Sequence, residues 1–207
     1  MGIKMITINK KTIMKKLLLI AFMLLIMVTH HTLAQSNADA SWVLTADQNA
    51  VVTGDIVAHH QTLHNLSVNN YISGDGGQRM LPPSGSWPAE TGPNNNRFIE
   101  YKISPDASYD LTVNEISMLL SFNSSSYGHA KIAWASDSVN FTDLAADISL
   151  VSGSAPVEHK FDHLDIEIPA GKSLYLRIYP WTTALMSNRY LVSKNVNVKL
   201  QTTRHQK

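Results

Sequence analysis

Four residues near the C-terminus and one in a central loop have side chains that could bind a sugar: Tyr175, Arg177, Tyr179, Trp181 and Trp87. The first three alternate on one face of a predicted strand, and Trp181 lies at the exit of that strand. Aromatic rings offer flat faces to the apolar side of a sugar, and a guanidinium can hold a uronate carboxylate through two parallel hydrogen bonds. Trp87 lies in a predicted loop rich in proline and glycine, where a side chain is least expected to be buried. We therefore predict a carbohydrate site made of these five residues.

The same residues have a packing interpretation, and the sequence supports it at least as well. Aromatic side chains supply much of the buried area of a β-sandwich. On this interpretation Tyr179 and Trp181 pack under a second layer, and Arg177 pairs with an acid. Two other tryptophans are predicted to lie in the core. Trp42 is next to the first strand, and Trp134 shares a strand face with Ile132.

No catalytic or metal-binding motif accompanies these residues. The chain has no cysteine, which excludes disulfides, a thiolate nucleophile and cysteine-ligated zinc. It also lacks the G-x-S-x-G, H-E-x-x-H and P-loop patterns. The closely spaced His59, His60 and His64 do not predict a metal site, because adjacent strand residues point to opposite faces. We therefore predict no enzyme activity and no cofactor. A structural calcium ion remains open, with three acids that could supply oxygen ligands: Asp137, Asp143 and Asp147.

Residues 1–34 have the features of a cleavable signal peptide. Five lysines come before or at the start of an unbroken apolar run of 12 residues, 17–28. Such a run is too short to cross a bilayer core, which needs about 20 apolar residues, and it has the length of a signal-peptide core. Small residues precede Gln35, the predicted mature start. An uncleaved anchor and a second start at Met14 are the alternatives. The prediction is a secreted protein, either extracellular or periplasmic.

Removal of residues 1–34 would change the sign of the net charge. The whole chain has 17 basic and 16 acidic residues, and the part from Gln35 onward keeps 12 basic and all 16 acidic ones, a net charge of −4. No basic stripe remains in it. We therefore predict that neither nucleic acid nor, after cleavage, a membrane surface is the partner.

Beyond residue 34 the sequence predicts strands and turns. Apolar residues recur with a period of two in 99–103, 164–168, 174–178 and 192–198, and glycine, proline and asparagine clusters separate these runs. The run 109–122 changes phase at Asn114-Glu115, which predicts a bulge or a tight turn. The stretch 73–96 is predicted to be the longest irregular segment.

About nine such strands predict an all-β fold: a two-sheet antiparallel β-sandwich, jelly-roll-like, filling one domain at 35–207 with its core at about 42–200. Apolar positions of the runs form the predicted interior: Leu111, Val113, Ile116, Met118, Leu120, Leu164, Ile166, Leu174, Leu176, Ile178, Val196 and Val198.

Three segments resemble a non-catalytic, galactose-binding-like β-sandwich module associated with pectate lyases and pectin esterases of Bacteroidetes. They are 96–105, 134–142 and 171–181, the last followed by 190–198. Ser138 stands where the hairpin of this family usually has glycine, so the turn is expected to be longer or of another type. The resemblance implies a jelly-roll-like fold and recognition of a plant or algal polysaccharide or oligosaccharide such as pectin, with a polysaccharide-degrading enzyme as a further partner.

Two other functions remain open at this point. The first is a structural or adhesion module that binds another protein through an exposed sheet edge or face. The second is a small jelly-roll polysaccharide lyase, in which Arg177 would act with Tyr179 or His129.

Overall fold

The computed structural model describes residue 15 and residues 35–72, 76–123, 125–153 and 155–204. The predicted signal peptide lies, except for residue 15, outside the described residues. Residues 35–207 form one compact unit. In the described part of the chain, no helix is long and apolar enough to cross a membrane.

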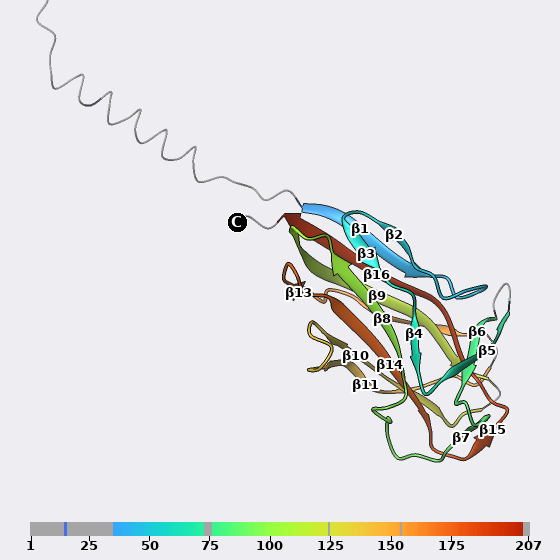
Figure 1. Cartoon of the computed structure of the whole chain (residues 1–207). Coiled ribbons are helices and arrows are strands. Elements are labelled where there is room, and N and C mark those ends of the chain that lie inside the picture. Colours follow the sequence, from blue (N-terminus) through green and yellow to red (C-terminus); the bar gives the residue numbers. More distant parts are fainter. Residues whose placement is uncertain (1–14, 16–34, 73–75, 124, 154, 205–207) are drawn as a thin grey trace, which may run out of the picture. The chain divides into compact units, whose positions relative to one another are not determined.

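Two antiparallel sheets build this unit (Figure 1). The first, named here the β16 sheet, has the order β12 (Val157–Phe161), β9 (Tyr109–Phe122), β16 (Leu191–Arg204), β1 (Gln35–Trp42) and β2 (Val51–Thr53), with β13 (Ile166–Ile168), β6 (Gly77–Leu81) and β5 (Ser67–Ile72) added beside it. The second, the β14 sheet, has the order β11 (Thr142–Ser149), β10 (Gly128–Ala135), β14 (Leu174–Thr182), β8 (Phe98–Pro105) and β3 (Ile56–Ala58), with β4 (Thr62–His64) also paired to β8. A small third sheet pairs β7 (Ser86–Trp87) with β15 (Met186–Ser187).

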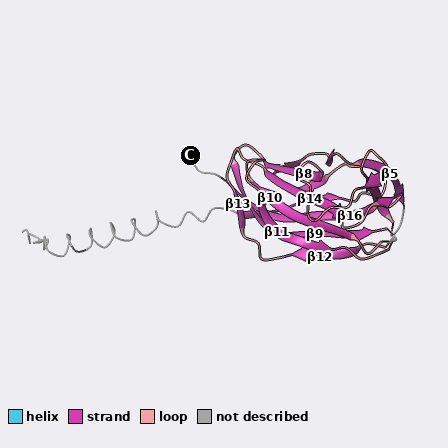
Figure 2. Cartoon of the chain, turned by 90° about the horizontal axis from the view of Figure 1, so that it is seen from below, coloured by secondary structure: helices cyan, strands magenta, loops and turns pink. Residues whose placement is uncertain are grey.

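Eight of these strands have the connectivity of a jelly roll. One layer has the order β1-β16-β9-β12 and the other has the order β8-β14-β10-β11. Along the chain these strands change sheet at every step except in the hairpin β10–β11, which is the connectivity of the eight-stranded jelly roll. Figure 2 shows β8 at one surface of the sandwich and β12 at the opposite surface. The predicted fold class is confirmed.

The core forms where the inward faces of the two sheets meet. Every predicted interior residue is buried except Leu164, which is half-buried against the same core. Trp42 is completely buried, and its Nε1 donates a hydrogen bond to the carbonyl oxygen of His59 at 3.0 Å. Trp134 is half-buried against the core. The period-two pattern therefore identified the inward face correctly.

A β-bulge interrupts β9 at the predicted phase change. Glu115 pairs with Lys199 of β16, and Val113 pairs with the next residue, Leu200, so that Asn114 has no partner in the register. The extra residue moves the following side chains to the opposite phase, so Val113 and Ile116 both face the core. The predicted irregularity at Asn114-Glu115 is confirmed as a bulge.

A buried polar cluster, which the sequence did not reveal, links the loop before β4 to the interior. Gln61 Nε2 donates to Gln78 Oε1 at 2.9 Å and to the Tyr101 hydroxyl at 2.8 Å, and Gln78 Nε2 donates back to Gln61 Oε1 at 2.8 Å. Burial raises the pKa of the Tyr101 hydroxyl. Because the two amides satisfy one another, the cluster fixes this loop between the sheets without leaving those amides unpaired.

Candidate functional site

The predicted site on β14 lies on the outer face of the β14 sheet, as the alternation required. Arg177 is engaged there by neighbouring side chains. Its Nε donates to Glu100 Oε2 at 2.7 Å, and its guanidinium carbon lies 3.9 Å from the ring centroid of Phe98 and 4.1 Å from that of Phe141. Glu100 occupies the position that a uronate carboxylate was predicted to take. The structure thus supports the packing interpretation of Arg177.

The aromatic residues beside Arg177 are buried as well. Trp181 is only 3% exposed and stacks on His129, with 5.3 Å between ring centroids and 18° between planes. Tyr179 is buried in a small cluster with Phe98, Ala133 and the partly buried Phe141. A sugar ring cannot stack on Trp181 or Tyr179 without displacing these neighbours, so the prediction that they form an open stacking surface is wrong.

Tyr175 differs from the others because it is half-buried. The Lys102 ammonium lies 5.4 Å from its ring centroid, within the range of a cation–π contact. On the outer face of the β14 sheet, Lys102 and Arg177 therefore lie against aromatic rings. We name the residues of this region the aromatic face: Phe98, Glu100, Lys102, His129, Phe141, Tyr175, Arg177, Tyr179 and Trp181.

Trp87 is not a loop residue. It belongs to β7, its side chain is 0% exposed, and its Nε1 donates to the carbonyl oxygen of Arg189 at 2.9 Å. Its ring meets Phe122 edge-on at 5.3 Å. The prediction that 73–96 is one irregular segment is wrong, because β6 and β7 lie within it. The prediction that Trp87 is accessible is also wrong, because its ring packs against Phe122 and the Arg97 guanidinium.

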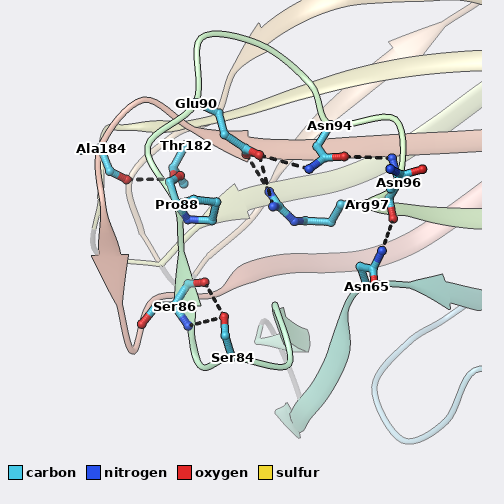
Figure 3. A network of polar contacts seen from close by, with 10 residues as sticks. All are labelled: Asn65, Ser84, Ser86, Pro88, Glu90, Asn94, Asn96, Arg97, Thr182 and Ala184. Carbon is cyan, nitrogen blue, oxygen red and sulfur yellow. Dashed lines mark hydrogen bonds and ion pairs between the residues drawn. The ribbon is translucent and has the colours of Figure 1, made fainter.

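Polar contacts hold this loop in place (Figure 3). Arg97 Nη1 donates to Glu90 Oε2 at 2.6 Å, and Asn94 Nδ2 donates to Glu90 Oε1 at 3.4 Å. Asn65 Nδ2 donates to the carbonyl oxygen of Asn96 at 2.7 Å. Arg97 is buried, and its guanidinium lies 5.6 Å from the Trp87 ring centroid. Arg97 therefore pairs with Glu90 and also covers the indole.

An open groove of about 820 Å³ lies on the outer face of the β16 sheet. It contains none of the five predicted site residues. Its lining comes from β1, β9, β16 and the loop between β12 and β13: Asn37, Ala38, Asp39, Asn114, Glu115, Asp162, His163, Asp165, Lys199, Leu200 and Gln201. The bulge residue Asn114 lies in this lining. The phase change that predicted the bulge from the sequence therefore marks one wall of the groove.

The loop wall of the groove has a strained backbone. His163 and Asp165 have φ angles of 54° and 49°, which non-glycine residues rarely adopt. Each such residue costs about 1–3 kcal/mol and persists only where its surroundings hold it. Between them, the Leu164 amide donates to the Asn114 carbonyl oxygen at 3.2 Å, and the Leu164 side chain packs against the core. These contacts present the side chains of His163 and Asp165 to the groove.

A row of charges crosses the groove. The Glu115 carboxylate accepts hydrogen bonds from Lys199 Nζ at 2.8 Å and from Lys160 Nζ at 2.9 Å. These two lysines lower the pKa of Glu115, and the carboxylate in turn raises the pKa of Lys160. Asp39 accepts a hydrogen bond from the Thr53 hydroxyl at 3.4 Å. Apart from Ala38 and Leu200, the remaining lining residues carry amides, carboxylates and an imidazole, which are groups that hydrogen-bond to hydroxyls and water.

The three acids considered as calcium ligands each have a separate partner. Asp143 pairs with Lys131 at 2.7 Å, and Asp147 Oδ1 accepts a hydrogen bond from His129 Nδ1 at 2.9 Å. Asp137 accepts hydrogen bonds from the amides of residues 139 and 140, which lower its pKa to about 2. Among the described residues, no group of three or more histidines, cysteines or acids could hold a metal ion.

The hairpin around Asp137 keeps the backbone conformation that glycine would adopt. Ser138 has a φ of 63°, in the left-handed region. The sequence predicted a longer or different turn at this position. Instead, Ser138 adopts the left-handed conformation, and the hydrogen bonds to Asp137 stabilise the turn. This hairpin carries Phe141 onto the aromatic face.

Comparison with known proteins identifies no family. No family model and no curated protein matches the chain. Among solved structures it is similar to CBM32-1 from a family 31 glycoside hydrolase of Clostridium perfringens, with 14% identity over 70% of this chain and 93% of that chain, and a TM-score of 0.32. It is also similar to VP2 of infectious bursal disease virus, with 10% identity over 86% of this chain and 58% of that chain, and a TM-score of 0.38.

The PRD1 vertex protein P5 is a third such structure, with 11% identity over 84% of this chain and 99% of that chain, and a TM-score of 0.27. Likenesses at this level do not assign a function. None of the three is described as part of a pectin-degrading system, so the predicted association with pectate lyases and pectin esterases stays a prediction. The jelly-roll class itself follows from the strand order.

Proposed function

We propose that residues 35–207 form an exported, non-catalytic module that binds a saccharide in the groove of the β16 sheet. The observation that carries this proposal is the groove lining itself, in which side chains of three neighbouring strands and a strained loop converge on an open polar surface. The ligand site thus moves from the aromatic face, where it was predicted, to the opposite sheet.

Amide and carboxylate groups suit a ligand with many hydroxyls. Asn37 and Gln201 each bring a donor and an acceptor on neighbouring strands, and Asp39 adds acceptor oxygens. Each hydrogen bond formed in exchange for water returns about 0.5–1.5 kcal/mol. Without an aromatic ring in the lining, the expected affinity is modest.

The charge of the groove favours a neutral polysaccharide over pectin. Asp39, Glu115, Asp162 and Asp165 face it, against Lys199 in the lining and Lys160 beside it. A uronate would meet this excess of carboxylates, and like charges repel. Pectin and a polysaccharide-degrading partner enzyme were implied by the family resemblance, and Arg177, the predicted partner of a uronate carboxylate, is paired with Glu100. A neutral plant or algal polysaccharide is therefore the ligand class that we propose.

The geometry around Arg177 gives the lyase alternative little support. A lyase needs a neutraliser for the substrate carboxylate beside a group that removes the proton. Arg177 is already held by Glu100, and His129 Nδ1 is bonded to Asp147 with the ring stacked on Trp181. We therefore propose binding without turnover.

Affinity electrophoresis tests the proposal. The purified protein would be run in native gels that contain xylan, galactan, pectin or alginate. We expect retardation by a neutral polymer, with loss of retardation in the double variant Asn37→Ala/Gln201→Ala. The matched control is Asn69→Ala, an exposed amide on β5 outside the groove lining. Absence of retardation by all four polymers, or equal loss in the control, would contradict the groove site. Release of an unsaturated product absorbing in the ultraviolet would instead indicate a lyase.

A further inference from the structure

The last strand of the β16 sheet, β2, is an exposed edge. Among the described strands it pairs only with β1, with Ser41 opposite Val51 and Asp39 opposite Thr53. Val51 is 61% exposed and Val52 is 40% exposed. Adjacent residues of a strand point to opposite faces, so exposure of both valines means that neither face of β2 is fully covered. Figure 1 shows β2 at the border of the sheet, beside β1.

Two other edge strands carry charges, whereas β2, like the edge strands β3 and β5, does not. At the far end of the same sheet, β12 contains Glu158 and Lys160, and the edge strand β11 of the β14 sheet contains two aspartates. Natural edge strands are commonly protected from pairing by charged residues or proline. β2 has the sequence Val-Val-Thr, and an exposed valine of the neighbouring strand β3, Val57, extends its apolar surface. This edge therefore has no charge or proline of its own to oppose strand addition, and its protection is limited to its length of three residues.

The surroundings of β2 are acidic. Between residues 35 and 78 there is no lysine or arginine, and Asp39, Asp47 and Asp55 come from this stretch. The lysine opposite Asp39 on β16, Lys199, is engaged by Glu115. An extended segment that pairs with β2 would therefore gain from basic residues beside its apolar ones. A second copy of this chain is disfavoured, because its own edge carries the same acids.

We propose that β2 accepts an extended segment of a partner protein, rich in β-branched residues and flanked by lysine or arginine, as an added antiparallel strand. The backbone of the segment pairs with β2, the valines contact its apolar side chains, and the acids select its charge. Asp39 is common to the strand edge and the saccharide groove, but Val51 and Val52 are absent from the groove lining, so substitutions at these valines test the edge separately from the groove.

A labelled peptide tests this inference. The probe is a fluorescein-labelled peptide of sequence KVTVTVK, titrated with the full protein at low salt and followed by fluorescence anisotropy. We expect saturable binding that weakens as salt is raised, because the flanking charges contribute. The variant Val51→Lys should weaken binding by about tenfold or more. The matched control is Val139→Lys, the same change at a 74% exposed valine in the hairpin between β10 and β11, which should bind as the wild type does.

Three results would overturn the proposal: no binding of KVTVTVK, equal binding of the acidic analogue EVTVTVE or of a backbone N-methylated KVTVTVK, or equal effects of Val51→Lys and Val139→Lys. Sedimentation velocity tests the alternative occupant of the β2 edge, a second copy of this chain. A wild-type dimer that Val51→Lys dissociates would show that a second copy, and not a basic partner, covers β2. Unchanged retardation of Val51→Lys in the polysaccharide gels would confirm that its fold and the groove are intact.

Discussion

The two outer faces of the sandwich use their charged residues in different ways. On the β14 sheet, Arg177 and Lys102 lie against aromatic rings, and Arg177 is paired with a half-buried carboxylate. On the β16 sheet, Lys160 and Lys199 pair with Glu115, which lies in the lining of an open groove. The first face is closed by its own side chains, and the second leaves polar groups accessible to a ligand.

An aromatic-rich strand face is therefore not by itself a binding surface. The hairpin after β10 brings Phe141 over Arg177 and within 6.4 Å of the Tyr179 ring centroid, which completes a small second core outside the sheet. The aromatic face is therefore expected to contribute to stability, and the groove to binding. Substitutions on the two faces should separate these roles.

The largest effect is expected from Trp181→Ala. Trp181 is buried and stacked on His129, so truncation removes a large apolar contact and leaves a cavity. We expect a loss of about 3–5 kcal/mol in the free energy of unfolding, measured by urea denaturation. Polysaccharide retardation should persist under conditions where the variant is folded. A stability within about 0.5 kcal/mol of the wild type, together with lost retardation, would restore the aromatic face as the binding surface.

A smaller loss is expected from Arg177→Ala, about 2 kcal/mol, because it leaves the half-buried Glu100 without its partner and removes a guanidinium stacked on two rings. The double variant Arg177→Met/Glu100→Gln should recover part of this loss, since no charge is left unpaired and the methionine keeps an apolar chain between the rings. Urea denaturation of the single variants Arg177→Met and Glu100→Gln and of the double variant gives the coupling energy. A coupling near zero would contradict the pairing.

The smallest effect is expected on the open face, from Glu115→Gln. The two lysines lower the pKa of Glu115 below its ordinary value of 4.5, so the stability due to this carboxylate is present above that pH and is lost as the pH falls below it. The variant should therefore be slightly less stable at pH 7 and should show a shallower decline below about pH 4.5 than the wild type does. Thermal melts between pH 3 and pH 7 measure this difference. A loss at pH 7 as large as that of Arg177→Ala would contradict the contrast between the faces.

The alternation of apolar and polar residues was sufficient to predict which side chains face the core. In a strand, side chains alternate between two faces, so the apolar phase identifies the inward one, and a phase change such as that at Asn114 marks a bulge. Repeated short strands separated by turn residues were sufficient for the fold class, because few architectures can bury so many half-apolar strands. Export of the chain stays a prediction from the sequence.

The residues that cover each outer face could not be predicted from local patterns, because they depend on how distant segments pack. Tyr179 and Trp181 would alternate identically whether solvent or another segment covered them, and the segment that brings Phe141 comes from a hairpin distant in the sequence. The groove likewise joins β1, the bulge in β9, β16 and a loop, and no local pattern records that they meet. Periodicity reports the direction of a side chain, whereas exposure depends on which distant segments pack beside it.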